Sequence, residues 1–308
     1  MKRYSRELTV VAALALLLIA LAIFAPHFFT PQPLLSRFAA QTPALIAAIG
    51  MTLVIISRQI DISIGSQFGI CAVTAGLLAA AGLPLPVVIL AAIGAGAAMG
   101  ALNGLLVAWL GLPSIVVTLA TMVTWQEGLR LWQQGRLLNL PAGMQWFGLS
   151  QTAGQTLLLV FAIGLVAAAA WAMRHLAAGR RVYAVGSDAE AARLAGIDPR
   201  RTTFGVFLLM GALTGLAAVM NVAQSPQVQP TSGDGLELKV IAACVVGGVA
   251  VSGGRGTLWG VFPGLLLLAN INPALTHLHV QAYWEKAIQG LVILLAVVAD
   301  GLGRRNAK

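Results

Sequence analysis

The sequence predicts an all-α integral membrane protein with about ten transmembrane helices, some broken or re-entrant, and with both termini in the cytoplasm. Hydrophobic residues make up 58% of the 308 residues and charged residues only 9%, whereas a soluble domain carries roughly 25% charged residues. A chain this apolar cannot cover itself with polar surface, so its solvent is lipid. Apolar runs of about the twenty residues that a bilayer requires recur along the chain.

Ten segments are candidate spans. Because they are distributed along the whole chain, we expect residues 1–308 to form a single membrane domain. They are 8–25, 39–57, 62–81, 84–110, 114–132, 154–173, 204–224, 238–252, 256–272 and 283–300. The first resembles a signal peptide, but no small-x-small cleavage site follows it, so we expect an uncleaved helix. Glycine-rich breaks around 57–66 and 250–258 leave those boundaries open and indicate half-helices on either side.

The distribution of positive charge predicts the orientation. With the N-terminus inside, fourteen of the nineteen Lys and Arg residues fall in inside segments and five fall outside or at outer span ends. This is the bias expected of cytoplasmic loops. An even number of spans also places the basic C-terminal GLGRRNAK inside. The net charge of +9 therefore reflects membrane orientation, and we expect no nucleic-acid binding.

One long polar segment, 174–203, interrupts the apolar sequence and carries six arginines. Ser187 and Glu190 stand three apart, as in a capping box with Ser187 as the N-cap. A helix is expected over 188–195, where residues with good helix propensity follow. Gly196 is placed to end this helix in a left-handed conformation, and Pro199 to stop its continuation.

A helix of about two turns is too short to be stable alone, so it needs a surface to lie against. Two interpretations of this surface stay open: it belongs to the rest of the same protein, or to a soluble partner. We favour a partner, because no other soluble part of the chain exists to receive the helix.

The segment RQIDISIGS, 58–66, places a carboxylate beside a span. Such a charge is costly and is usually paired. Arg58 and Asp61 stand three apart, so on a helix they can pair with each other. Two interpretations stay open: a discontinuous helix beside a pathway, or a helix-end cap at the cytosolic interface.

The segment GGVAVSGGRGT, 247–257, looks like a phosphate-binding loop without matching one. A P-loop requires G-x-x-x-x-G-K-[ST], and none of the four lysines is followed by Ser or Thr. We interpret the segment as a tight turn with glycine-mediated helix packing. We expect no nucleotide site and no cofactor.

Polar residues inside the predicted spans are candidates for a pathway that carries a hydroxyl-rich solute. For any single one of them, hydrogen bonding between helices is the favoured alternative. They are Asn103, Thr118, Thr121, Thr124, Gln126, Asn221, Gln224 and Asn270. His277 and His279 alone do not make a metal site. The sequence shows no Ser-His-Asp or Cys-His pattern typical of a catalytic site, so we do not expect an enzyme.

Four stretches resemble the membrane permease subunits of bacterial ATP-binding-cassette (ABC) importers for ribose and related sugars. They are RQIDISIGS, ALNGLLVAWLGLPSIVVTLATM, YAVGSDAEAARLAGI and VIAACVVGGVAVSGGRGTLWG. The likeness runs from about 49 to 301 in the order of the family. Within it, permeases of autoinducer importers, which carry a furanosyl signalling sugar, and of rhamnose importers are the most similar.

The resemblance implies a location in the bacterial inner membrane and three partners. They are a cytosolic ABC ATPase, an extracytoplasmic sugar-binding protein and a second permease subunit, in a homodimer or a heterodimer. It makes 174–203 a cytosolic coupling loop, with the family's ATPase-coupling motif on Gly186, Ser187, Asp188, Glu190, Ala191, Ala192, Arg193, Gly196 and Ile197. The family's D-[LI]-S-x-G-S pattern falls on 61–66.

We take a set of polar residues as candidates for the pathway or its gate. They are Asp61, Ser63, Ser66, Asn103, Thr118, Thr121, Asn221 and Asn270. The alternative function is a self-sufficient secondary transporter or channel, which predicts a carboxylate or cation site within the membrane. The carboxylates near spans, Asp61, Glu127 and Glu237, all lie toward span ends, and a coupling-type helix would go unexplained. The sequence does not identify the sugar.

Overall fold

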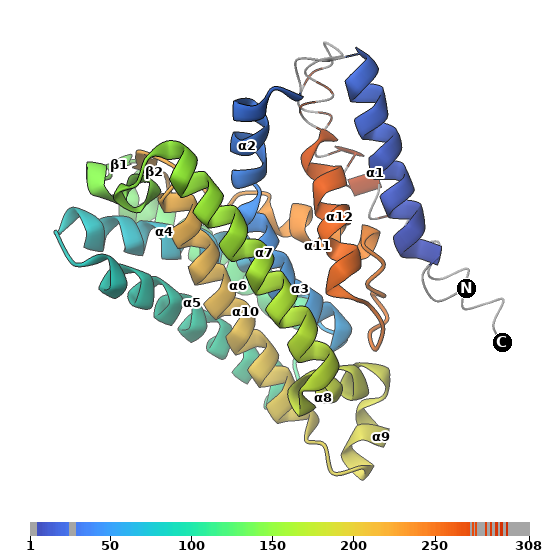
Figure 1. Ribbon diagram of the computed structural model, residues 1–308. Coiled ribbons are helices and arrows are strands. Elements are labelled where there is room, and N and C mark those ends of the chain that lie inside the picture. Colours follow the sequence, from blue (N-terminus) through green and yellow to red (C-terminus); the bar gives the residue numbers. More distant parts are fainter. Residues whose placement is uncertain are drawn as a thin grey trace.

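Figure 1 shows the computed structural model of the chain, which describes residues 5–24, 29–271 and isolated positions between 273 and 294. The predicted span 283–300 lies outside the described residues except for a few such positions, and so do His277 and His279.

The described chain is almost entirely α-helical. Its α-helices are α1 (Ser5–Phe24), α2 (Pro31–Ala39), α3 (Thr42–Ile56), α4 (Ile64–Ala80), α5 (Leu85–Ala108), α6 (Ser114–Gln133), α7 (Gln151–His175), α8 (Ala177–Ser187), α9 (Ala189–Leu194), α10 (Pro199–Val222), α11 (Leu236–Val246) and α12 (Leu258–Ala269). The remaining elements are a 3-10 helix, η2 (Ala142–Gly148), and two short strands, β1 (Leu138–Asn139) and β2 (Gln227–Val228).

Among the described residues, four helices are long and apolar enough to cross a membrane. They are α5, α7, α10 and the stretch Leu34–Ile56, which joins the end of α2 to α3. These helices confirm an all-α membrane protein, while the number of ten spans and the side of the termini stay predictions.

The predicted eighth and ninth spans are shorter in the structure than in the sequence analysis. α11 ends at Val246, whereas the predicted segment runs to 252, and α12 has 12 residues. At 1.5 Å per residue, helices of this length fall well short of the roughly 30 Å hydrocarbon core. Consecutive residues with positive φ, at Gly253 and Gly254, make the tight turn predicted between them.

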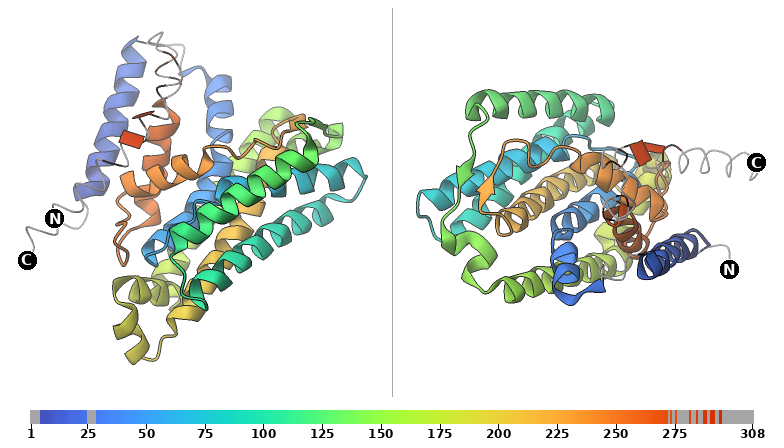
Figure 2. Two further views of the ribbon diagram at one scale, coloured as in Figure 1. Left: turned by 180° about the vertical axis from the view of Figure 1, so that it is seen from behind. Right: turned by 90° about the horizontal axis from the view of Figure 1, so that it is seen from above.

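The centre of the molecule is α10, which packs against α3, α4 and α5. Gly96 and Gly100 of α5 face the backbone of α10 at Gly211, and a Cβ at either glycine would collide with that backbone. Glycines four residues apart let two membrane helices approach this closely. By contrast, α6 lies at one edge of the molecule in the right-hand view of Figure 2 and packs on α4 and α5.

The two ends of the molecule differ. β1 and β2 pair antiparallel, with Leu138 opposite Val228 and Asn139 opposite Gln227. This pairing joins the loop after the predicted span 114–132 to the loop after the predicted span 204–224. The predicted orientation places both loops on the extracytoplasmic side. Figure 1 shows α8 and α9 at the opposite end.

Candidate functional site

The segment 174–203, which the sequence analysis predicts to be a coupling loop and which is called the coupling segment below, contains more helix than predicted. α7 runs to His175, and α8 follows it, although the sequence analysis expects a loop there. α8 buries Gly179, Val182 and Val185, which are spaced three apart on one face. This spacing was the available signal for α8, but the two glycines of α8 weaken a helical pattern.

The predicted N-cap is wrong by one residue. Ser187 is the last residue of α8, and Asp188 caps α9. The Asp188 carboxylate accepts hydrogen bonds from the main-chain nitrogens of Glu190 (2.9 Å) and Ala191 (3.0 Å). A carboxylate is favoured there because the N-terminus of a helix carries partial positive charge.

Glu190 does not complete a capping box but pairs with Arg193, with 2.6 Å between Oε1 and Nη2. Hydrogen bonding to Glu190, together with its charge, raises the pKa of the Arg193 guanidinium above its usual value. Both side chains are exposed, so this pair contributes little to the stability of the fold.

The end of α9 is as predicted. Gly196 has a φ of +80°. The nitrogen of Gly196 donates to the oxygen of Arg193 (3.0 Å), and the nitrogen of Ile197 donates to the oxygen of Ala192 (2.9 Å), which is the Schellman pattern. Pro199 does more than stop the helix, because it is the first residue of α10.

The faces of α9 are unequal. Ala192 is buried, whereas Ala189, Ala191 and Arg193 are exposed. Leu194, which the sequence analysis did not select, is 80% exposed. The outward surface of α9 therefore combines small alanines and the Glu190–Arg193 ion pair with one protruding leucine.

The end of α8 meets two breaks in membrane helices. The nitrogen of Gly254 donates to the oxygen of Ile56 (2.8 Å), and Gly186 lies against both residues so closely that a Cβ would collide with the Ile56 oxygen. Tyr183 of α8 donates from its hydroxyl to the oxygen of Gly256 (2.8 Å). The break after α3 and the turn after α11 therefore converge on the coupling segment.

The predicted Arg58–Asp61 pair is wrong. Arg58 has a φ of +65° and donates from Nε to the oxygen of Ser252 (2.8 Å). Asp61 accepts from Ser63 instead, through its nitrogen (2.9 Å) and Oγ (2.6 Å). α3 ends at Ile56, so the three-residue spacing that would join Arg58 to Asp61 on a helix does not apply. The helix is broken between Ile56 and Ile64, as the interpretation of a discontinuous helix expects, while a pathway beside this break stays a prediction.

Five of the eight pathway candidates come together around Asp61. Asn103 of α5 donates from Nδ2 to Ser63 Oγ (2.8 Å), and Ser66 donates from Oγ to the Ser63 oxygen (2.8 Å). Thr118 of α6 reaches the main-chain oxygen of Ile60 at 3.3 Å. All five side chains are buried, so this cluster joins the start of α4 to α5 and α6.

The other three candidates lie elsewhere. Thr121 donates to carbonyls of its own helix, and Asn270 donates to the Leu266 oxygen one turn back. Asn221 is half-buried on α10. Gln67 Oε1 and Asn103 Oδ1, both at the Asp61 cluster, have no hydrogen-bond partner among the described residues.

A second polar network was missed by the sequence analysis. Arg130 of α6 pairs with Asp234 (2.9 Å) and with Glu127 (2.8 Å), and Gln126 donates to Asp234 (2.9 Å). Arg130, Glu127 and Asp234 are each more than one-third exposed. Gln126 was a candidate from its place in a span, but nothing in the sequence joins α6 to a loop 104 residues away.

Comparisons with known proteins place the chain in a family. Residues 34–297 match the family described as the branched-chain amino acid transport system / permease component. The chain is 36% identical over 298 residues to the autoinducer 2 import system permease protein LsrC of Salmonella typhi, covering 96% of this chain and 86% of that protein.

The LsrC proteins of Enterobacter sp. (strain 638) and Escherichia coli (strain K12 / DH10B) are each 37% identical, with 96% of this chain and 87% of theirs covered. No solved structure matches the chain. The chain belongs to the family of transport permease components that includes these LsrC proteins.

Proposed function

We propose that the protein is the permease subunit of a bacterial ABC importer and moves a sugar or sugar-like solute across the inner membrane, powered by a separate ATPase. The observation that carries the proposal is the α8–α9 unit, in which α9 is capped at both ends. This unit projects from the membrane helices and contacts two helix breaks. The relatives belong to autoinducer 2 import systems by name, so a furanosyl signalling sugar is the first solute to test.

The outward surface of α9 is the proposed contact with the ATPase. Fully burying a leucine side chain contributes about 1.5–3 kcal/mol relative to leaving it in water. Leu194 is 80% exposed, and a groove on the ATPase would remove it from water. The exposed alanines beside it allow close approach of the two backbones.

The contacts of α8 suggest how a movement reaches the pathway. Gly186 touches the oxygen of Ile56 and the nitrogen of Gly254, so α8 cannot shift without displacing the ends of α3 and of the turn before α12. The Asp61 cluster begins five residues after Ile56. We assign this cluster to gating and positioning, because its side chains are buried within the subunit.

The outer half of α6 is the proposed lining of the solute pathway. Charged residues on membrane helices face protein or water rather than lipid. α6 has 20 residues, yet it is not among the helices apolar enough to span on their own, and Glu127 and Arg130 are exposed on it. A second permease subunit facing α6 would enclose these groups, and their donors and acceptors suit a hydroxyl-rich solute.

A self-sufficient transporter has less support. Its ion site would need an available carboxylate within the membrane. Asp61 is already satisfied by Ser63 and by Gln67 Nε2 at 3.3 Å. Glu127 and Asp234 both pair with Arg130. Within the described residues, no group of three or more His, Cys, Asp or Glu side chains could hold a metal ion.

The test is co-purification of the permease with its ATPase. Leu194→Asp places a charge on the proposed contact and should abolish both ATPase recovery and solute uptake. Leu137→Asp is the matched control, because Leu137 is also exposed (51%) but lies next to β1 at the opposite end. Normal ATPase recovery with Leu194→Asp would contradict the proposal that the ATPase docks on this surface.

A further inference from the structure

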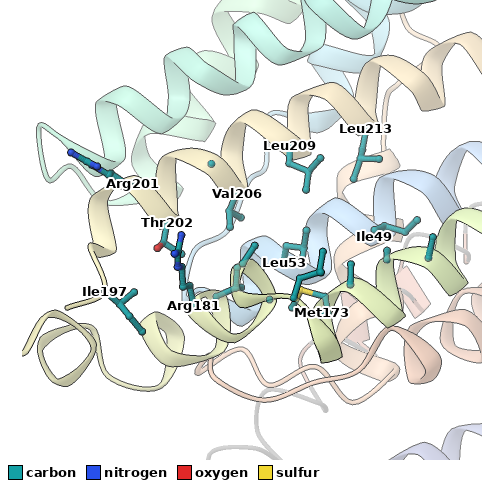
Figure 3. Close-up of a pocket in the computed structure, with 18 of the residues that line it drawn as sticks. Ile49, Leu53, Met173, Arg181, Ile197, Arg201, Thr202, Val206, Leu209 and Leu213 are labelled. Atoms are coloured by element: carbon teal, nitrogen blue, oxygen red, sulfur yellow. The ribbon is translucent and has the colours of Figure 1, made fainter. Parts of the chain in front are cut away.

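A cavity of about 770 Å³ lies between α3, α7 and α10 and is closed at one end by α8 and the turn after α9 (Figure 3). Most of its lining is apolar and includes Ile49, Leu53, Leu165, Met173 and Val206. Leu209 also lines it and is 45% exposed, so the cavity reaches the outer surface of the helix bundle.

The polar lining residues are confined to one end of this cavity. They are Arg181 of α8, Asp198 at the start of α10, and Arg201 and Thr202 of α10. Figure 3 shows Arg181, Arg201 and Thr202 at the α8 end, away from Leu209 and Leu213, with Arg181 next to Thr202 and the Arg201 side chain pointing outward. Arg201 pairs with Asp198 at 3.2 Å, but its side chain is still 84% exposed. Two guanidinium groups and one carboxylate leave this end net positive.

We propose that the cavity binds an anionic phospholipid, with an acyl chain along the apolar lining and the phosphate at Arg181, toward which the exposed Arg201 side chain turns on binding. Guanidinium groups bind phosphate through paired, charge-assisted hydrogen bonds. Basic pockets between membrane helices on the cytoplasmic side suit anionic headgroups, which are enriched in that leaflet. The cytoplasmic position of α8 rests on the proposed function.

The other occupants fit less well. A sugar would find few hydrogen-bonding groups along the apolar part, where buried hydroxyls without partners are costly. An apolar face of a second subunit would desolvate two guanidinium groups without supplying their countercharge. A lipid satisfies both ends of the cavity at once.

The position of the cavity gives the lipid a consequence for transport. Gly196 and Ile197, which form the capped end of α9, are part of its wall. A bound lipid therefore fills the space behind the coupling segment and holds α8 and α9 against α10. Anionic lipid should stabilise this segment and support coupling to the ATPase.

The test measures binding of phosphatidylglycerol and of phosphatidylcholine to the full-length purified chain, by native mass spectrometry and by thermal unfolding. Each basic residue near an anionic headgroup contributes about 1 kcal/mol, so two arginines should give phosphatidylglycerol a preference of roughly tenfold or more. Arg181→Gln combined with Arg201→Gln should remove most of this preference. Arg180→Gln combined with Arg200→Gln, which changes adjacent arginines outside the cavity lining, should keep it.

A second variant tests the apolar part. A Cβ at Gly205 of α10 meets nothing within 4 Å, so Gly205→Leu can start its side chain into the cavity that Gly205 lines. Gly164→Leu on α7 is the control, because Gly164 is equally open but does not line the cavity. Gly205→Leu should lower lipid binding several-fold, and Gly164→Leu should not.

Unchanged phosphatidylglycerol preference in the double arginine variant, together with unchanged lipid binding in Gly205→Leu, would overturn the proposal. So would a wild-type dimer that Gly205→Leu dissociates without any effect on lipid binding, since a second copy would then occupy the cavity. The measurement uses neither ATPase nor solute. The lipid proposal can therefore fail while the proposed transport function stands, and the transport function can fail while the lipid proposal stands.

Discussion

The main-chain nitrogen of Gly254 donates a 2.8 Å hydrogen bond to the oxygen of Ile56, which ties the turn between α11 and α12 to the end of α3. Gly186 of α8 lies against both groups and has no room for a Cβ. Gly186 thus contacts one residue about 130 positions before it in the sequence and another about 70 positions after it. A change at this contact should affect coupling and both helix breaks together.

Gly186→Ala should therefore be disruptive, although it is a small change. The added methyl group meets main-chain atoms, which cannot move aside as a flexible side chain can. Overpacking of this kind costs typically 1–3 kcal/mol. We expect a lower thermal unfolding temperature and loss of uptake. The control is Gly164→Ala, where a Cβ meets nothing within 4 Å. Equal stability of the two variants would show that this contact is not tight in the protein.

Charge removal at Asp61 and at Arg58 should give independent losses. Asp61→Asn weakens hydrogen bonds to a charged group, which are worth about 1.5–3 kcal/mol. Arg58→Gln removes a separate bond to the oxygen of Ser252. In a double-mutant cycle of unfolding in denaturing detergent, we expect the two losses to add within about 0.5 kcal/mol. A coupling energy well above that value would restore a direct pair between the two residues.

The features that the sequence analysis predicted correctly depend on local geometry. Gly196 ends α9 because only a few residue types adopt a positive φ readily, and the glycine-rich segment around Gly254 breaks a span for the same reason. The break at 57–66 could also be predicted from the sequence, because a carboxylate and serines interrupt an apolar run.

The features that were missed depend on contacts between distant segments. Arg58 and Asp61 are near in sequence, but a left-handed residue turns one toward Ser252 and leaves the other to Ser63. Asp234 pairs with Arg130 across 104 residues. The N-cap was misassigned because Ser187 and Asp188 both suit that position, and the choice depends on where α8 ends.

The orientation can be tested by reporter fusions. Asn139 in β1 pairs with Gln227 in β2, at the end of the molecule away from α8 and α9. Fusions at Asn139 and Ser232 should report the extracytoplasmic side, and a fusion at Asp188 should report the cytoplasm, following the distribution of arginines. Reporters for both compartments provide the control at each site. An extracytoplasmic signal at Asp188 would contradict the orientation and the docking of an ATPase on α9.

The last prediction separates the two faces of α9. Ala191 is exposed and Ala192 is only 4% exposed, although both lie in the motif that suggests coupling. Ala191→Trp should block ATPase binding sterically while leaving thermal unfolding of the permease unchanged. Ala192→Trp should destabilise the permease itself, because a buried alanine site cannot take an indole without displacing its neighbours. Measuring unfolding of the isolated permease alongside ATPase recovery distinguishes the two effects. If Ala191→Trp retains the ATPase and wild-type uptake, the outward face of α9 is not the coupling surface, because an indole there would occupy the space that the ATPase needs.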